Sequence, residues 1–204
     1  MTLAVDNISK SFNRRSVLCN ISFTVARGES IAVTGKNGSG KSTLLKVLAG
    51  LLTPSGGAVH YLVDGEKHQP EDIRTRIGFV SPYLQLYDEF SALENIELIS
   101  RIRSARIASS DVCERLLASF DLWGRRDDLV RTYSSGMKQK LKYVVALVDD
   151  PDILMLDEPS ANLDADGIQA VTAILDSAKK RVLVVATNDE REAARCGKRI
   201  HLGA

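Results

Sequence analysis

The spacing of apolar and polar residues divides the chain into three parts. In residues 1–35, apolar and polar positions alternate, as in Leu3–Val5 and Ile21–Val25, which predicts half-buried strands. From about Pro82 to Asp150 the spacing is helical, and after Asp150 short apolar runs alternate with helical segments. Strands that alternate with helices are typical of a parallel sheet covered on both faces. We therefore predict an α/β fold in which an N-terminal antiparallel β part and an inserted helical subdomain accompany a parallel core.

Individual elements follow from the same patterns. The predicted strands are Ile31–Val33, Ala58–Val63, Ile77–Val80, Ile153–Leu156, Val182–Ala186 and Arg199–Leu202. The predicted helices are Ser42–Leu52, Asp111–Phe120, Ser135–Val148, Asp164–Lys179 and Glu190–Arg195. Ser91–Glu94 has the form of a capping box and predicts a further helix start. At 204 residues, the chain is expected to be one domain (1–204), with a core of 1–82 and 150–204 and a helical insertion of about 83–149.

Composition excludes several classes of protein. The chain has 27 basic and 26 acidic residues, and this balance argues against a protein held on nucleic-acid phosphates. Cys19, Cys113 and Cys196 form no CxxC pair, so we expect neither a disulfide partner nor a zinc site. No apolar run approaches the roughly 20 residues that span a bilayer, and residues 1–6 show no signal-peptide pattern. These features predict a cytoplasmic protein with reduced thiols.

A phosphate-binding loop is predicted where the strand Ile31–Val33 runs into a helix. Gly35–Ser42 matches G-x-x-x-x-G-K-[ST], in which backbone N–H groups and the helix N-terminus surround phosphate oxygens. Lys41 would reach the β- and γ-phosphates and the Ser42 hydroxyl would bind Mg²⁺; the alternative is an ordinary glycine turn. The predicted nucleotide-binding residues here are Gly35, Asn37, Gly38, Ser39, Gly40, Lys41, Ser42 and Thr43.

Two acidic residues end the apolar strand Ile153–Leu156. Such a strand carries Asp157 to the carboxyl edge of a parallel sheet, where ligands bind. Asp157 would join Ser42 at Mg²⁺, and Glu158 would orient or deprotonate an attacking water. The alternative is a solvated turn at the end of the strand.

Two further motifs flank this acidic pair. Tyr133–Lys140 precedes it and Ser160–Asp164 follows it; together with Gly35–Ser42 they resemble the nucleotide-binding subunit of an ATP-binding cassette (ABC) transporter. The resemblance extends from Leu3 to about Leu202 and implies a RecA-like P-loop NTPase fold that binds ATP and Mg²⁺. It also implies a head-to-tail pair with a second ABC ATPase subunit, a transmembrane permease partner, and a peripheral position on the inner face of the membrane.

The resemblance assigns further roles residue by residue. Phe12 lies where an aromatic ring stacks on adenine, although it could instead be a core residue. Ser134, Ser135 and Gly136 lie where the signature loop clamps the γ-phosphate on the opposite subunit; a plain helix cap is the alternative. Asp164 belongs to the loop that couples the two sites.

An aromatic cluster marks the expected permease contact. Four of the chain's ten Phe and Tyr residues lie between Phe79 and Phe90. In ABC ATPases this region receives a helix of the membrane subunit, and aromatic side chains suit such a groove. The alternative is that they pack the helical insertion against the core. The cluster consists of Phe79, Tyr83, Leu86, Tyr87 and Phe90.

The sequence departs from the family pattern at two catalytic positions. Pro82 stands where the family has a glutamine, and Gln85, three residues later, is a candidate substitute or a surface residue. Asn188 stands where the family has a histidine; it can donate a hydrogen bond but cannot carry imidazolium charge. The resulting catalytic set is Glu158, Lys41, Asn188 and Gln85, and we expect slow ATP hydrolysis.

Three other functions were weighed against a transporter ATPase. A non-hydrolysing ATP-gated clamp would explain Pro82 and Asn188 as lost catalysis. A nucleic-acid maintenance ABC ATPase would carry a long coiled-coil or zinc insertion, which the sequence lacks, and a P-loop kinase would not need Ser134–Gly136. The signature, in which Ser135 and Met137 replace glycine and glutamine, is similar to that of exporters.

Overall fold

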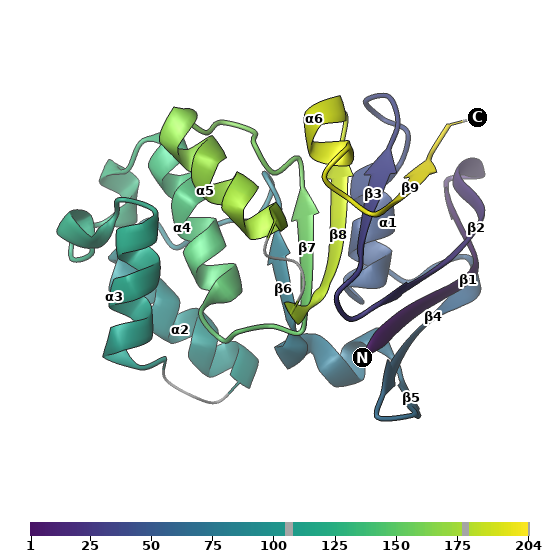
Figure 1. The fold of residues 1–204 in the computed structure, drawn as a ribbon, viewed down its shortest axis with the longest axis horizontal. Helices are drawn as coiled ribbons and strands as arrows, with labels where there is room; N and C mark the ends of the chain where they lie inside the picture. The colour runs from purple at the N-terminus through teal and green to yellow at the C-terminus, as the bar shows by residue number, and fades with distance from the viewer. Residues whose placement is uncertain (105–107, 177–179, 204) are drawn as a thin grey trace.

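Two β-sheets meet side by side in the computed structural model, which describes residues 1–104, 108–176 and 180–203 (Figure 1). One is an antiparallel sheet with strand order β2-β1-β4-β5, and the other is a parallel sheet with order β6-β7-β8-β3-β9. The strands are β1 (Thr2–Phe12), β2 (Arg15–Ala26), β3 (Ser30–Thr34), β4 (Gly56–Val63), β5 (Glu66–His68), β6 (Ile77–Val80), β7 (Ile153–Asp157), β8 (Val182–Thr187) and β9 (Lys198–His201).

The helices lie mostly between the parallel strands in the chain. They are α1 (Lys41–Leu48), α2 (Ala92–Ser104), α3 (Ser110–Ser119), α4 (Ser135–Leu147), α5 (Ala165–Asp176) and α6 (Glu190–Ala193), with 3-10 turns η1 (Pro70–Arg76), η2 (Trp123–Arg125) and η3 (Val130–Thr132). Figure 1 shows α2, α3 and α4 grouped beyond the β6 edge of the parallel sheet, away from the antiparallel strands. The helical insertion therefore leaves the sheet after β6 and returns to it at β7.

The strand β7 shows why the parallel sheet is apolar on both faces. Successive side chains of a strand point to opposite faces. Ile153 and Met155 pack in a core with α1 and the antiparallel sheet, whereas Leu154 and Leu156 pack in a second core with the helices of the insertion and α5. All four side chains are buried, because each face of the sheet is covered by another layer.

The predicted elements are found, with small differences at their ends. Helix α1 stops at Leu48 rather than Leu52, because Gly50 adopts a left-handed φ of 69° that ends the helix. The capping box at the start of α2 is confirmed: the Ser91 N–H donates to the Glu94 carboxylate at 2.7 Å, and the Glu94 N–H donates to the Ser91 hydroxyl at 3.2 Å. The predicted helix Asp164–Lys179 begins at Ala165, and its last three residues lie outside the described part of the chain.

The helices can be compared with the length and apolar composition of a membrane-spanning helix. In the described part of the chain, every helix falls short of the length and apolar character that crossing a bilayer requires.

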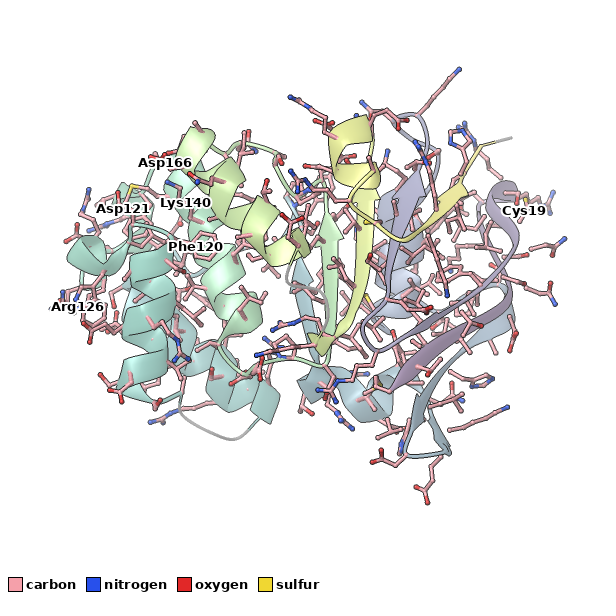
Figure 2. The ribbon with its side chains drawn as sticks, viewed as in Figure 1. Cys19, Phe120, Asp121, Arg126, Lys140 and Asp166 are labelled. Atoms are coloured by element: carbon pink, nitrogen blue, oxygen red, sulfur yellow. The ribbon has the colours of Figure 1, made fainter. Side chains whose placement is uncertain are left out.

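The three cysteines are free thiols: Cys19 is exposed on the antiparallel sheet, at the end of the molecule opposite the helical insertion (Figure 2), and Cys113 is buried.

Candidate functional site

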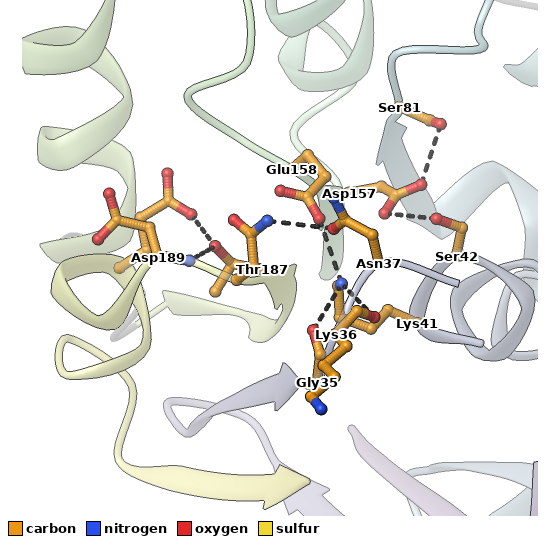
Figure 3. Close-up of polar contacts among 12 residues, drawn as sticks. Gly35, Lys36, Asn37, Lys41, Ser42, Ser81, Asp157, Glu158, Thr187 and Asp189 are labelled. Carbon is orange, nitrogen blue, oxygen red and sulfur yellow. Dashed lines mark hydrogen bonds and ion pairs between the residues drawn. The ribbon is translucent and has the colours of Figure 1, made fainter. Parts of the chain in front are cut away.

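A cavity of about 1080 Å³ lies at the carboxyl ends of the parallel strands. The loops that follow β3, β7 and β8 all reach it, as expected where ligands bind to open parallel sheets. It is lined by every residue from Asn37 to Thr43, by Asp157 and Glu158, and by Asn188. Residues that the sequence separates by more than 140 positions therefore share one site (Figure 3).

The loop after β3 is shaped to hold an anion. Gly40 has a φ of 99°, and a Cβ there would lie 2.9 Å from a methyl group of Val17, so only glycine fits without a shift of the backbone. The loop then enters α1 at Lys41. Because the first N–H groups of a helix have no intrahelical acceptor and lie at its positive end, this geometry is an anion site. The prediction of a strand, a glycine loop and a helix is confirmed here.

Lys41 points back over this loop. Its ammonium, on a side chain only 5% exposed, donates to the Gly35 carbonyl at 2.9 Å and lies 3.4 Å from the Glu158 carboxylate. Gly35 is therefore a support for Lys41 and is not itself in the cavity wall. The ammonium is held between the loop and the acidic end of β7, where a phosphate would meet it.

Asp157 forms the acidic corner of the cavity. Its side chain is fully buried; one carboxylate oxygen accepts from the Ser42 hydroxyl at 2.9 Å and the other from the Ser81 hydroxyl at 3.2 Å. Hydroxyl and carboxylate oxygens are the donors that Mg²⁺ prefers, and Mg²⁺ commonly takes one or two protein ligands and completes its shell with phosphate oxygens and water. The described residues hold no cluster of three or more His, Cys, Asp or Glu that could bind a metal alone. Ser42 and Asp157 therefore fit Mg²⁺ bound together with a nucleotide.

Glu158 lies at the cavity wall, and its carboxyl has a raised pKa. Burial raises the pKa of its carboxyl above the ordinary value of 4.5, and the Lys41 ammonium opposes that rise. Its backbone has a φ of 50°, a strained conformation for a residue with a side chain, and its N–H donates to the Ala186 carbonyl at 2.8 Å. The backbone of Glu158 is thus held against the end of β8, and its side chain lines the cavity.

The end of β8 is connected to the same loops. The Asn188 side-chain amide donates to the Asn37 side-chain carbonyl at 3.2 Å across the cavity rim. Behind it, the buried Glu192 of α6 accepts hydrogen bonds from the Thr187 hydroxyl, from the Ser160 hydroxyl and, at 3.2 Å, from the Ser160 N–H. One carboxylate therefore ties the segment after β7 to the segment after β8.

The structure brings Phe12 to the cavity and keeps Gln85 away from it. Phe12 lines the cavity with 44% of its surface exposed, and the Lys10 ammonium lies 5.0 Å from the ring centre. Gln85 is exposed and is not among the lining residues, so the structure does not support it as a substitute for the missing glutamine. Pro82 does line the cavity. The side chain that contacts Asp157 from this segment is that of the adjacent Ser81.

The segment Ser134–Gly136 does not line the cavity of its own chain, so its contact with a nucleotide on a second subunit stays a prediction. Ser134 caps α4, and its hydroxyl accepts from the Met137 N–H at 3.2 Å. Ser134 and Ser135 are exposed. Farther along α4, Lys140 reaches toward α5 (Figure 2) and pairs with Asp164 at 2.9 Å, which lowers the pKa of that carboxyl.

The aromatic cluster divides into two groups. Phe79 packs against the core around α1, and Leu86 packs against the core of the helical insertion. Tyr83, Tyr87 and Phe90 are exposed by 73%, 49% and 39%, and the Tyr87 and Phe90 rings lie 5.6 Å apart. Packing against the core therefore accounts for Phe79 and Leu86, whereas a permease contact stays a prediction for the three exposed aromatic side chains.

Three contacts near the site were missed by the sequence analysis. They involve Ser81, Glu192 and Lys142, whose ammonium donates to the Pro82 carbonyl at 2.9 Å. A signal for Ser81 was present: it follows the apolar run Ile77–Val80 as Asp157 follows Ile153–Leu156, and β6 and β7 are parallel neighbours. Glu192 and Lys142 lie in helices, where nothing in the local pattern indicates what they contact.

The family model and the similar proteins both point to ATP-binding proteins of transporters. Residues 18–161 match the family model described as ABC transporter. The lipoprotein-releasing system ATP-binding protein LolD of Shewanella denitrificans is 33% identical over 215 residues, which cover 98% of this chain and 91% of that protein. The lantibiotic transport ATP-binding protein SrtF of Streptococcus pyogenes is 31% identical over 183 residues, covering 90% and 77%.

Solved structures show the same similarity. An ATP-binding subunit of an ABC transporter aligns with a TM-score of 0.86 at 29% identity, covering 99% of this chain and 86% of that one. The dimeric post-hydrolysis state of the ATP-binding cassette MJ0796, bound to ADP and Pi, also aligns with a TM-score of 0.86, at 25% identity, covering 98% and 94%.

Proposed function

The chain belongs to the ATP-binding proteins of the ABC transporter family, and from this premise we propose that it hydrolyses ATP slowly to power export through a membrane permease. The observation that carries the proposal is the convergence of Lys41, Ser42, Asp157 and Glu158 at one cavity. A phosphate-binding cation, two Mg²⁺ ligands and a general base are the groups that phosphoryl transfer to water requires.

Each group has a distinct part in the proposed reaction. The N–H groups at the start of α1 and the Lys41 ammonium bind the phosphates, and Ser42 and Asp157 would hold Mg²⁺, which would supply positive charge near the phosphate oxygens. Glu158 orients the attacking water and accepts its proton at a carboxylate oxygen. Phe12 supplies an exposed ring on which adenine stacks. Thr43 and Asn37 complete the cavity wall around the phosphates.

A second copy of the chain is proposed to complete the site. Ser134 and Ser135 are exposed and Gly136 is half-buried at the N-terminus of α4, a position that favours an anion. They lie outside their own cavity, so the γ-phosphate they clamp belongs to the opposite subunit. The solved MJ0796 cassettes are dimers, which supports this arrangement.

The membrane partner is proposed to bind at Tyr83, Tyr87 and Phe90. Tyr83 itself lines the nucleotide cavity, and Tyr87 and Phe90 follow it in the same short segment, so we expect movement at the nucleotide to reach all three. Docking on a permease would place the subunit on the cytoplasmic face of the membrane. The relatives act in lipoprotein release and lantibiotic transport, and the signature at Ser134–Met137 is similar to that of exporters, which together favour export.

An ATP-gated clamp with little hydrolysis is the second candidate. Pro82 has no side-chain amide and Asn188 has no imidazole, so the two positions that usually assist Glu158 are weakened. The family's positioned hydrogen bonds supply much of the catalysis, so their loss favours slow or absent turnover.

Steady-state ATP turnover with Mg²⁺, in the wild type and in Glu158→Gln, separates the two candidates. Turnover that is lost in the variant supports an ATPase with Glu158 as its base. Tight ATP binding with equal, negligible turnover in both proteins supports the clamp. The same pair of proteins should then be measured with the permease present, because a partner that restores Glu158-dependent turnover would reject the clamp.

A further inference from the structure

Lys142 lies in an unusual environment in the middle of α4. The residue is 8% exposed, and its ammonium donates to the Pro82 carbonyl at 2.9 Å and to the Ser81 carbonyl at 3.3 Å. Burial lowers the pKa of this amine, and the charge of Lys138 lowers it further. Two backbone carbonyls, rather than a carboxylate, therefore compensate for the buried ammonium, and such burial is costly unless the hydrogen bonds are maintained.

The segment that Lys142 holds leads directly to the Mg²⁺ corner. The Ser81 hydroxyl donates to Asp157 at 3.2 Å and accepts from the Tyr83 N–H at 3.3 Å. Asp157 in turn accepts from the Ser42 hydroxyl at 2.9 Å. A continuous series of hydrogen bonds thus joins α4, the end of β6, the end of β7 and the start of α1.

Pro82 takes part in this series of hydrogen bonds only through its backbone. Proline has no N–H and no side-chain amide, so this position can contribute only its carbonyl to a polar contact. That carbonyl is bound by Lys142. The turn that leaves the sheet edge at β6 is therefore held from α4, the helix that begins beside Ser134–Gly136.

We propose that Lys142 is a positioning residue that holds Ser81 against Asp157 and thereby couples the orientation of α4 to Mg²⁺-dependent nucleotide binding. This inference rests on the proposed function, because it assigns a role within the same nucleotide site. The ammonium does not touch the nucleotide; it acts through the backbone of Ser81 and Pro82. A purely structural lysine would stabilise the turn without affecting the metal.

The test is the affinity of a ribose-labelled fluorescent ATP analogue, measured with Mg²⁺ and again with EDTA. Lys142→Met keeps the apolar stem but removes the donor, and Ser81→Ala removes the hydroxyl at the other end of the connection. We expect each variant to lose roughly tenfold in affinity with Mg²⁺, the effect of one hydrogen bond to a charged group, and to bind as the wild type does in EDTA. The double variant should lose no more than either single variant, because both break one connection.

Two conservative variants and a control guard against misfolding. Lys142→Arg and Ser81→Thr keep the donors and should retain most of the Mg²⁺-dependent affinity. Arg101→Met removes an exposed charge from α2, where the arginine pairs with Glu97 at 2.6 Å, and should bind Mg²⁺ and nucleotide as the wild type does. If Lys142→Met does not fold, Ser81→Ala and Ser81→Thr test the same connection from its other end.

Different results would reject different claims. Unchanged Mg²⁺-dependent affinity in folded Lys142→Met or Ser81→Ala, or losses that add in the double variant, would overturn the role of Lys142. A wild type that binds the analogue but shows no turnover, either alone or with the permease present, would leave this inference standing and reject the proposed hydrolysis. A wild type that binds the analogue neither with Mg²⁺ nor in EDTA would overturn both.

Discussion

The two sides of the nucleotide cavity are built on different principles. The phosphate side consists of one continuous segment, Asn37–Thr43, whose backbone and Lys41 form the proposed anion site. The opposite side, where water and metal are expected, is assembled from the ends of β6, β7 and β8 and includes Ser81, Asp157 and Asn188. The first side matches the pattern G-x-x-x-x-G-K-[ST], whereas the second has Pro82 and Asn188 where the resemblance to ABC ATPases predicts glutamine and histidine.

This difference shows where variation is tolerated. Binding phosphates depends on backbone N–H groups in one fixed loop conformation, so a change of glycine or lysine there has no nearby substitute. The metal and water side depends on side-chain hydrogen bonds from several elements. Because these groups come from separate elements, a substitution in one of them leaves others in place, such as the Ser81 hydroxyl that contacts Asp157.

The largest effect should come from the phosphate side. Lys41→Ala removes the buried ammonium that lies between the Gly35 carbonyl and Glu158. We expect turnover to fall by roughly a hundred- to a thousandfold, the effect of deleting one preorganised charge stabiliser. Lys36→Ala, which removes an exposed charge from the same loop, is the matched control and should keep its turnover. Comparable losses in both variants would mean that general loop charge, and not Lys41, binds the phosphates.

Glu192→Gln should give the next largest effect, on the opposite side. The amide presents a donor where the carboxylate accepted hydrogen bonds from Thr187 and Ser160. We expect a loss of about 2 kcal/mol in the free energy of unfolding by urea titration, since hydrogen bonds to a buried charge are affected. Glu190→Gln on the same helix breaks only the exposed pair with Arg199 and should cost less than about 1 kcal/mol. Equal losses of unfolding free energy in the two variants would mean that the buried hydrogen bonds of Glu192 stabilise the protein no more than an exposed ion pair does.

Restoring the family residues should increase turnover moderately. The double substitution Pro82→Gln and Asn188→His supplies a side-chain amide and an imidazole that can carry charge. We expect about a tenfold gain in single-turnover rate, equivalent to about 1.4 kcal/mol of transition-state stabilisation. The further substitution Glu158→Gln should abolish the gain if the restored groups act through the base. No gain would indicate that Ser81 and Asn188 already perform these roles.

The smallest effect is a displacement of the acidic limb of the pH profile. Burial raises the pKa of Glu158 above 4.5, so this base becomes protonated, and turnover falls, at a higher pH than an exposed glutamate would require. A single-turnover pH profile at saturating Mg²⁺ and ATP should show this limb. The residual turnover of Glu158→Gln should show none, and nucleotide binding measured over the same range should separate the effect from unfolding. A limb at or below 4.5 would contradict the burial of the base.

Much of the fold could be predicted from local patterns. The strand Ile77–Val80 and the capping box at Ser91 lie where predicted, because alternation and capping depend on residues a few positions apart. The ends of elements follow less directly from these patterns: α1 stops at Leu48 because Gly50 takes a left-handed conformation. The spacing of apolar residues does not indicate where the backbone angle φ becomes positive.

The sequence by itself determined the residues of the phosphate loop and the acidic pair Asp157–Glu158, since each is one continuous segment whose role follows from its own backbone and charge. The tertiary structure alone decided that Ser81 rather than Gln85 meets Asp157, and that Lys142 and Glu192 hold the loops around the cavity. These contacts join residues 76, 60 and 32 positions apart. They depend on which helix packs against which strand end, and that is settled only when the whole core forms.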